Sequence, residues 1–378
     1  MKHGLNIVMS LLMAMTAMVI DARAIRPPGR TLHLNSNDGL SNDYVKSMTQ
    51  DSLGSIWIAT EGGLNRFDGN SFQIYTKENS GLSSNELNTV YYDPRANVTW
   101  VSTQRDGLCY YDYATDSICH VGTWDGLATN DIPYVAPAND GGIWLTHYHL
   151  GVQHYSLRPD ETLERFTIGS VTDEQLPHPS WVAVEDFNGH LYVGHVSDGM
   201  SIIDIATKKC RNFNHEPDNP NSLPGDEVFA ICIDRNGIVW IGTNNGAASY
   251  NPSTDTFTRI MHRNSDPSSL LPGMIMDIKQ MDNGDIWFAS SQGGVSILGM
   301  QSHAFVKPED FKFQNIISSE NDHSINGASI RSILQDSYGN VWLGSYRTGL
   351  DFISSSPSLF SQVPYKQAVY GGHHRQTV

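Results

Sequence analysis

The sequence has 378 residues, of which 24 are basic and 40 are acidic, so its formal net charge at pH 7 is −16. Nucleic acids and anionic membrane surfaces repel a protein of this charge, which argues against both as partners. The sequence also lacks a phosphate-binding Gly-Lys-Ser/Thr loop, a His-Glu-x-x-His motif and a Gly-x-Ser-x-Gly elbow, and its four cysteines lack the spacing of a zinc site. We therefore expect no catalytic residues, no cofactor and no metal.

The first 24 residues have the features of a secretory signal peptide. Lys2 supplies the positive charge, residues 5–20 are apolar, and Ala22-Arg23-Ala24 fits the small-x-small cleavage pattern. No later stretch reaches the roughly 18 apolar residues that a transmembrane helix needs. The sequence therefore predicts export to the periplasm, with no membrane contact by this segment.

After the signal peptide, one pattern recurs seven times at intervals of 43 to 55 residues. Each copy places an aromatic anchor three residues after a turn residue and follows it with a branched and then a small residue. A period of about 45 residues built of short strands is typical of a β-propeller with one blade per repeat. We predict an all-β, seven-bladed propeller over residues 25–358, with residues 359–378 as a linker or the start of a second propeller. The anchors are Trp57, Trp100, Trp144, Tyr192, Trp240, Trp287 and Trp342.

The first copy shows how one blade is organised. Alternation around Val45, Ser47 and Thr49 predicts an inner strand, and Asp51 to Gly54 form a turn. Residues 55–60, 64–67 and 72–75 predict three further strands, so each blade is a four-stranded antiparallel sheet.

Three positions around the anchor carry structural meaning. The residue three before the anchor is Gly in six copies and Asn97 in the other, as a turn with positive φ requires. An Asp six before the anchor in four copies is expected to accept backbone N–H bonds within that turn. The small residue two after the anchor shares the anchor's side of the strand, and we expect the ring of one blade to fill the gap over its neighbour's small residue. The four Asp residues are Asp51, Asp186, Asp234 and Asp336.

A ring of blades needs its ends fixed together. Residues 31–35 form a strand pattern that has no blade of its own, and we predict that it is the outer strand of blade seven. The competing segment is 359–365, which also has the look of a fourth strand.

The cysteines allow one disulfide. Cys109 and Cys119 lie on the third and fourth strands of blade two, on either side of the turn at 112–116. They face each other if the hairpin is symmetric, and an oxidising compartment permits the bond. Cys232 lies in an inner strand and is expected to be a buried free thiol.

The candidate binding residues lie in the loops between the second and third strands and between blades. In a four-stranded blade these loops emerge on one face, and here they carry amides, charges and aromatic rings suited to a polar ligand such as a sugar. His147 and His149 are also half of a possible metal site, although ordinary loop histidines explain them better. The candidates are Arg105, Trp124, His147, Tyr148, His149, Trp181, Asp198, Asn244, Asn245, Gln292, Tyr346 and Arg347.

Longer stretches of the chain resemble a known family. Residues 38–76, 218–252, 266–278 and 321–353 closely resemble the two-component regulator propeller repeats in the periplasmic sensor region of Bacteroidetes hybrid two-component systems. The resemblance implies a receptor that has two propellers, a dimer partner and a membrane-anchored histidine kinase, and that senses glycan fragments to control polysaccharide-utilisation genes. It implies a sensor role for this chain, as the first propeller, without enzyme activity. It assigns no ligand residue, because the repeat residues build the blades.

Two other functions stay open from the sequence. Propellers of similar repeat, of the streptogramin-lyase type, carry out eliminations with a convergent His/Glu set, for which His147, His149 and His195 are the nearest histidines. A protein-interaction scaffold is the other alternative, and its sign is a large apolar patch on the face that carries the loops.

Overall fold

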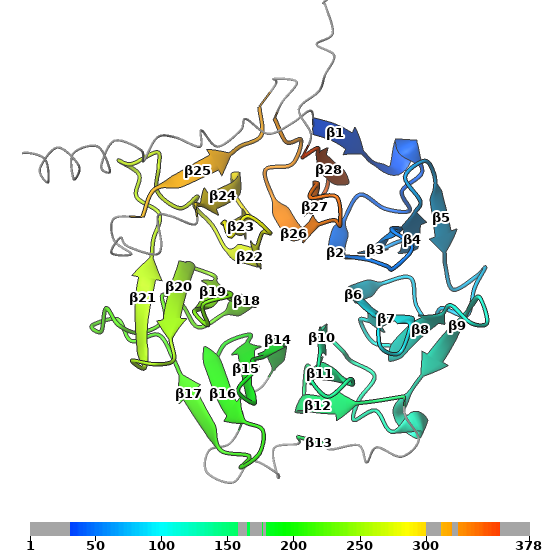
Figure 1. Cartoon of the computed structure of the whole chain (residues 1–378), viewed down its shortest axis with the longest axis horizontal. Coiled ribbons are helices and arrows are strands. Elements are labelled where there is room, and N and C mark those ends of the chain that lie inside the picture. The colour runs from blue at the N-terminus through cyan, green and yellow to red at the C-terminus, as the bar shows by residue number, and fades with distance from the viewer. Residues whose placement is uncertain are drawn as a thin grey trace, which may run out of the picture.

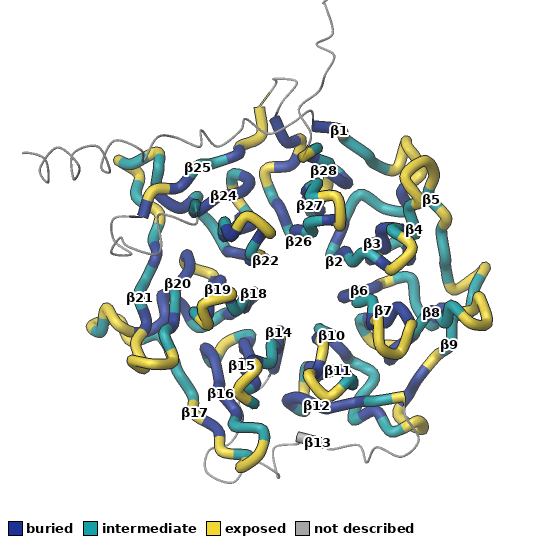
Figure 2. The backbone as a smooth tube through the Cα atoms, viewed as in Figure 1, coloured by how far each residue is buried: buried dark blue, intermediate teal, exposed yellow. Residues whose placement is uncertain are grey.

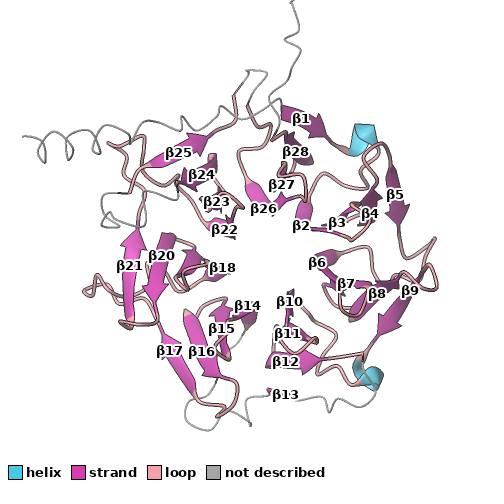
Figure 3. Ribbon diagram, in the orientation of Figure 1, coloured by secondary structure: helices cyan, strands magenta, loops and turns pink. Residues whose placement is uncertain are grey.

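A computed structural model of the chain describes residues 31–157, 165–166, 176, 179–299, 311–319 and 324–355. Its strands form seven four-stranded antiparallel sheets, arranged as blades around a central axis (Figure 1). The described residues contain only two short 3-10 helices, η1 (Ser36–Asp38) and η2 (Thr123–Asp125), as Figure 3 shows. No helix among them has the length and apolar character needed to cross a bilayer. The predicted all-β, seven-bladed fold is confirmed, whereas the predicted signal peptide lies outside the described residues.

The strands fall into four concentric sets. The innermost strands are β2 (Val45–Gln50), β6 (Leu87–Asp93), β10 (Tyr134–Pro137), β14 (Ser180–Glu185), β18 (Val228–Ile233), β22 (Ile275–Gln280) and β26 (Ile330–Gln335). The second strands are β3 (Ile56–Thr60), β7 (Val98–Thr103), β11 (Ile143–His147), β15 (His190–His195), β19 (Val239–Thr243), β23 (Ile286–Ser290) and β27 (Val341–Ser345). The third strands are β4 (Gly63–Phe67), β8 (Leu108–Asp112), β12 (Gly151–Tyr155), β16 (Met200–Asp204), β20 (Gly246–Asn251), β24 (Gly294–Leu298) and β28 (Leu350–Ile353). The outer strands are β5 (Phe72–Tyr75), β9 (Ser117–Val121), β13 (Arg165–Phe166), β17 (Cys210–Phe213), β21 (Thr256–Ile260), β25 (Phe313–Ile316) and β1 (Thr31–Leu34).

The second strands form the most buried layer of the ring (Figure 2). Their anchors are core residues, as predicted, with Trp57 fully buried and Trp240 2% exposed. Trp287 differs, because it is only partly buried at the edge of the apolar cluster between blades six and seven. The ring is therefore held by apolar clusters that lie mostly between neighbouring blades.

The first turn of each blade has the predicted positive-φ residue, and in blades one, five and seven an additional bond joins the turn to the anchor. Gly54 has φ of +89° and Asn97 has φ of +52°, which gives the left-handed backbone that the turn needs. In blade five, Asp234 Oδ1 accepts the backbone N–H of Asn236 at 2.8 Å. Its other oxygen, Oδ2, accepts the Trp240 indole N–H at 3.0 Å. The same carboxylate therefore closes the turn and satisfies the buried indole.

The anchors without this bond show why the spacing matters. In blade two the turn is one residue longer, and the buried Trp100 Nε1 atom has no hydrogen-bond partner in the part of the chain that the structure describes. In blade three, Trp144 Nε1 donates instead to Glu185 of the next blade at 2.7 Å. Among the described residues, an Asp bonds the indole of its own blade in blades one, five and seven, where it lies six positions before the Trp.

The small residue after the anchor admits the next blade, although its neighbour is not an aromatic ring. A Cβ atom on Gly344 would lie 2.5 Å from Val45 Cγ1, and one on Gly242 would lie 2.6 Å from the Ile275 carbonyl oxygen. Both contacts are with the start of the next blade's inner strand. The expectation that an anchor ring fills this gap is wrong at these positions, because the inner strand of the next blade already occupies it.

The predicted ring closure is confirmed. β1 pairs antiparallel with β28, with Thr31 opposite Ile353 and Leu34 opposite Leu350. The His33 imidazole also contacts the buried Asp351 carboxylate, which accepts the Asn326 backbone N–H at 3.0 Å. Blade seven therefore holds strands from both ends of the described chain. The competing segment 359–365 lies outside the described residues. The outer-strand position of blade seven is occupied by β1, as predicted for residues 31–35.

The disulfide between Cys109 and Cys119 that the sequence allows is not formed. Both thiols are free, and the strands are offset so that Cys109 lies opposite His120 and Cys119 opposite Tyr110. An offset of one residue puts the two side chains on opposite faces of the sheet. Cys232 is free, and burial raises the pKa of its thiol to about 11.

Ring closure makes a direct prediction. Deleting residues 25–36 is expected to abolish cooperative unfolding, because blade seven loses its outer strand and the bonds between β1 and β28. The thermal transition followed by circular dichroism checks this. Deleting residues 359–365 is the matched control and is expected to leave the transition in place. A cooperative transition after the first deletion would contradict this closure.

The shared role of Asp234 makes a second prediction. Asp234→Ala orphans a buried indole N–H and two turn N–H groups, so it is expected to lower the free energy of unfolding by about 3 kcal/mol. Asp282→Ala is the control, because Asp282 lies 80% exposed in the corresponding turn of blade six. Denaturant unfolding measures both changes. Equal destabilisation by the two variants would show that the indole bond contributes nothing.

Candidate functional site

A β-bulge lies at the start of most inner strands. In β2, Val45 pairs with Thr60 and Ser47 with Ala59, which leaves Lys46 as the extra residue. The pairings of β14, β18, β22 and β26 shift at the same place, and that of β6 shifts between Leu87 and Val90. Bulges redirect a side chain and are common beside functional sites. The residue before the bulge is fully buried in each of these blades, so the redirected residue is the first that faces the axis.

Blade three places a residue at the same position without a bulge. Ile132 is fully buried like its counterparts, and Pro133 follows it. Proline lacks the N–H that a ladder needs, so β10 begins its pairing only at Tyr134. The seven corresponding residues, called the bulge ring below, are Lys46, Asn88, Pro133, Trp181, Phe229, Met276 and Arg331.

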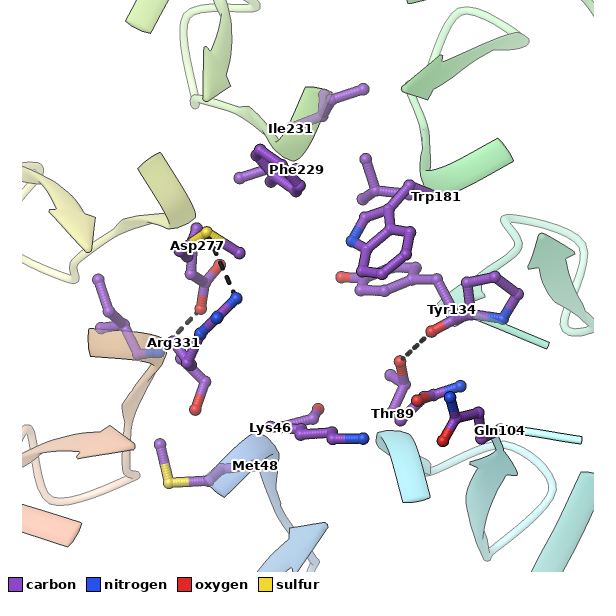
Figure 4. Close-up of a pocket in the computed structure, with 18 of the residues that line it drawn as sticks. Lys46, Met48, Thr89, Gln104, Tyr134, Trp181, Phe229, Ile231, Asp277 and Arg331 are labelled. Carbon is purple, nitrogen blue, oxygen red and sulfur yellow. Dashed lines mark hydrogen bonds between the residues drawn. The ribbon is translucent and has the colours of Figure 1, made fainter. Parts of the chain in front are cut away.

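The bulge ring lines a central cavity of about 460 Å³ (Figure 4). All seven of its residues contribute to the wall, together with others from the inner strands and from the loops that follow the second strands. The cavity therefore takes one different side chain from the same structural position in every blade.

One side of the cavity is apolar. Trp181 of blade four and Phe229 of blade five meet edge to face, with ring centroids 6.2 Å apart. Ile231 and Tyr134 extend the same wall, and Figure 4 shows Trp181 and Tyr134 on one side of the opening. Trp181 is 36% exposed although it belongs to an inner strand, so its ring presents a free surface inside the ring of blades.

The opposite side is basic, and its Arg331 packs against two aromatic rings. Its guanidinium carbon lies 5.6 Å from the Tyr44 ring centroid and 5.1 Å from that of Tyr346. These two rings meet edge to face at 4.6 Å, so they hold the guanidinium by cation–π contacts. Among the described residues, Arg331 makes no ion pair, and its Nε atom is buried without a hydrogen-bond partner.

Two lysines also line the cavity, each with a carboxylate nearby. Lys46 Nζ lies 3.3 Å from Glu61 Oε1, and Lys279 Nζ lies 4.0 Å from Asp277 Oδ1. The Asp277 carboxylate raises the pKa of the Lys279 ammonium, whereas burial raises the pKa of the Asp277 carboxyl. We take Lys279 as charged, because half of its side chain reaches water in the cavity.

The structure brings together only some of the predicted site residues. Arg105, Tyr148 and Trp181 line the central cavity, and Tyr346 lies behind Arg331. Asn244 and Asn245 lie instead at a second hollow between blades four and five. Trp124, on η2, is 74% exposed and packs on His120 at the outer strand β9. The residues that line neither hollow are Trp124, His147, His149, Asp198, Gln292, Tyr346 and Arg347.

Two of the three histidines that suggested a metal or a catalytic base, His147 and His195, are buried within their blades, whereas His149 is exposed. His147 is fully buried, with Nδ1 at 3.0 Å from Thr129 Oγ1 and Nε2 at 3.1 Å from Gln153 Oε1. His195 is also fully buried and contacts Ser201 Oγ at 2.7 Å. Both lie three residues after the anchor, where the other five blades have a buried Ser or Thr that closes the next turn. Among the described residues, no group of three or more His, Cys, Asp or Glu is arranged to hold a metal.

Six of the seven residues of the bulge ring are not among the residues predicted from the sequence. Only Trp181 was selected, because it is a Trp that is not an anchor. The available signal was the spacing, since each residue of the ring lies 11 positions before its anchor, or 12 in blade two. That position varies in residue type, so a search for a recurring residue passes over it.

Comparisons with known proteins agree with this architecture. The two component regulator propeller family matches residues 39–62, 222–245 and 324–347. These segments contain the anchors of blades one, five and seven, which are the three blades in which an Asp bonds its own anchor Trp. A 38-residue stretch is 50% identical to histidine kinase P4 of Formosa agariphila, and covers 10% of this chain and 3% of that protein.

Solved structures extend the similarity over most of the chain. The extracellular domain of a B. thetaiotaomicron protein described as a hybrid two component system is 35% identical over 87% of this chain, with a TM-score of 0.75. A second such domain from B. thetaiotaomicron, at 21% identity and a TM-score of 0.67, shares the fold. Virginiamycin B lyase from Staphylococcus aureus also shares the fold, at 11% identity, a TM-score of 0.62 and coverage of 86% of this chain and 99% of that one. This chain spans 42% and 39% of the two B. thetaiotaomicron domains.

The seven repeats, the Asp–anchor turns and the 35% identity therefore agree. The chain contains two-component regulator propeller repeats, and it is similar in sequence and fold to part of the extracellular domain of a B. thetaiotaomicron hybrid two-component system.

Proposed function

We propose that this propeller is the periplasmic ligand-sensing part of a hybrid two-component receptor, and that its central cavity binds a glycan fragment. In the receptor, a second propeller and a dimer partner would transmit binding to a histidine kinase that controls polysaccharide-utilisation genes. The periplasmic location is supported by the similar extracellular domains and by the predicted signal peptide.

The observation that carries the proposal is the free aromatic surface of Trp181 inside a cavity with polar walls. Sugars bind where an aromatic face stacks on C–H groups while amides and charges take the hydroxyls. Trp181 and Phe229 supply the aromatic faces, and the side-chain amides of Asn88 and Gln104 supply the hydroxyl contacts. A cavity of about 460 Å³ falls within the usual range of small-molecule sites.

No observation favours the lyase alternative to the same extent. Its candidate bases His147 and His195 have no exposed surface and bond within their own blades. The similarity to virginiamycin B lyase, at 11% identity, concerns the fold alone. A scaffold function is also less favoured, because the exposed Trp124 and Trp181 lie apart, one at the outer edge and one at the axis.

The two non-anchor tryptophans give a direct test. Trp181→Ala is expected to weaken oligosaccharide binding at least tenfold, because truncating a central aromatic anchor usually costs about 2 kcal/mol. Trp124→Ala is the matched control and is expected to leave the affinity unchanged, since Trp124 lies outside the cavity.

Isothermal titration calorimetry against a panel of neutral and acidic trisaccharides measures both affinities. Loss of binding in Trp124→Ala but not in Trp181→Ala would place the binding site near Trp124, at the outer edge of the propeller. Absence of binding to every saccharide in the panel would contradict glycan sensing in the cavity.

A further inference from the structure

We infer that the cavity selects an anionic glycan: its basic wall binds a carboxylate or sulfate group while Trp181 and Phe229 stack on the sugar. This inference rests on the proposed function and specifies its ligand. It is carried by the distribution of charge, by the state of Arg331 and by the division of the bulge ring into two halves.

The charge balance of the cavity is the reverse of that of the chain. The whole sequence has 24 basic and 40 acidic residues. The cavity wall has four basic residues, Lys46, Arg105, Lys279 and Arg331, against two acidic ones, Asp131 and Asp277. A basic cleft in an acidic protein focuses a positive potential at that point, and it concentrates anions there.

Arg331 is prepared to receive an anion. Tyr44 and Tyr346 hold its guanidinium, so little side-chain entropy remains to be lost on binding. Its one hydrogen bond among the described residues is a weak one from Nη1 to Met276 Sδ at 3.6 Å. A planar guanidinium binds carboxylate or sulfate oxygens with two parallel hydrogen bonds. The unpaired Arg331 has the donors for such a contact.

Arg105 supplies a second cation that is free of ion pairs within the described residues. It lies in the exposed loop between β7 and β8, where it contributes to the cavity wall. Asp131 is close enough for Arg105 to lower its carboxyl pKa, although burial is the larger effect and raises it. An exposed arginine at the wall suits a role in attracting and orienting the anion.

The bulge ring places its cationic residues on one side of the cavity and its aromatic and apolar residues on the other. Its cationic members, Arg331 and Lys46, come from the adjacent blades seven and one, whereas Trp181, Phe229 and Met276 come from blades four, five and six (Figure 4). A neutral sugar uses the aromatic side and the amides of Asn88 and Gln104, and it leaves the guanidinium unpaired. A sugar that carries an acidic group uses both sides at once.

The test is calorimetry of the full chain with matched probes: neutral galactotriose, trigalacturonate and a sulfated galactotriose, together with galacturonate and inorganic sulfate. One acidic trisaccharide is expected to bind at least tenfold more tightly than the neutral one, and raising the salt from about 50 to 500 mM is expected to weaken it. The trigalacturonate and sulfated arms show whether carboxylate or sulfate is the recognised group.

Three variants assign the effect to the basic wall. Arg331→Gln is expected to weaken the preferred acidic trisaccharide at least tenfold and to leave galactotriose unchanged. Arg105→Gln, in an exposed loop, gives a smaller loss in the same direction and keeps the test valid if Arg331→Gln does not fold. Arg235→Gln is the matched control, because Arg235 is 58% exposed in the turn between β18 and β19, at the opposite end of the strands from the β7–β8 loop.

The outcomes separate this inference from the proposed function. Equal affinity for galactotriose and both acidic trisaccharides, unchanged in Arg331→Gln, overturns the selectivity and leaves glycan sensing in place. Binding of inorganic sulfate or galacturonate without any trisaccharide supports the anion site and counts against glycan sensing. Binding of none of the probes contradicts both.

Discussion

The pairing of β1 with β28 is the constraint on which the rest of the molecule depends. Each blade is a small sheet that leaves apolar surface exposed until its neighbours cover it, so seven blades are stable only as a closed ring. Blade seven completes its sheet with Thr31–Leu34, and it also packs against Val45 of blade one through the gap at Gly344. Closure brings all seven inner strands to one axis, and the cavity exists only because they meet there.

Two kinds of position serve two purposes in each blade. The anchor and its Asp recur with fixed spacing, because the indole N–H of Trp240 needs the carboxylate of Asp234 at hydrogen-bond distance. The bulge position also has a fixed location, but its side chain lines the cavity and is not part of the anchor packing. The scaffold can therefore present a different side chain from each blade at the axis, as it does with Arg331 and Trp181, without disturbing the packing.

Several errors in the expectations from sequence have one cause, which is the register of strands. Cys109 and Cys119 look paired in the sequence, but an offset of one residue turns them to opposite faces. His147 looks like a loop ligand, but the strand continues far enough to bury it in place of a turn-closing hydroxyl. Trp124 and Trp181 look equivalent between blades, yet one ends at the outer edge and the other at the axis.

The sequence by itself determined the number of blades, the anchors, the positive-φ turns and the closing strand at 31–35, because backbone geometry and core packing demand these residues wherever they occur. Only the tertiary structure decided which side chains share the cavity. Lys46, Trp181 and Arg331 are separated by more than a hundred residues, and they come together because a bulge in each inner strand turns one residue toward a common axis. The basic character of that axis, in a chain of charge −16, follows from this convergence and not from composition.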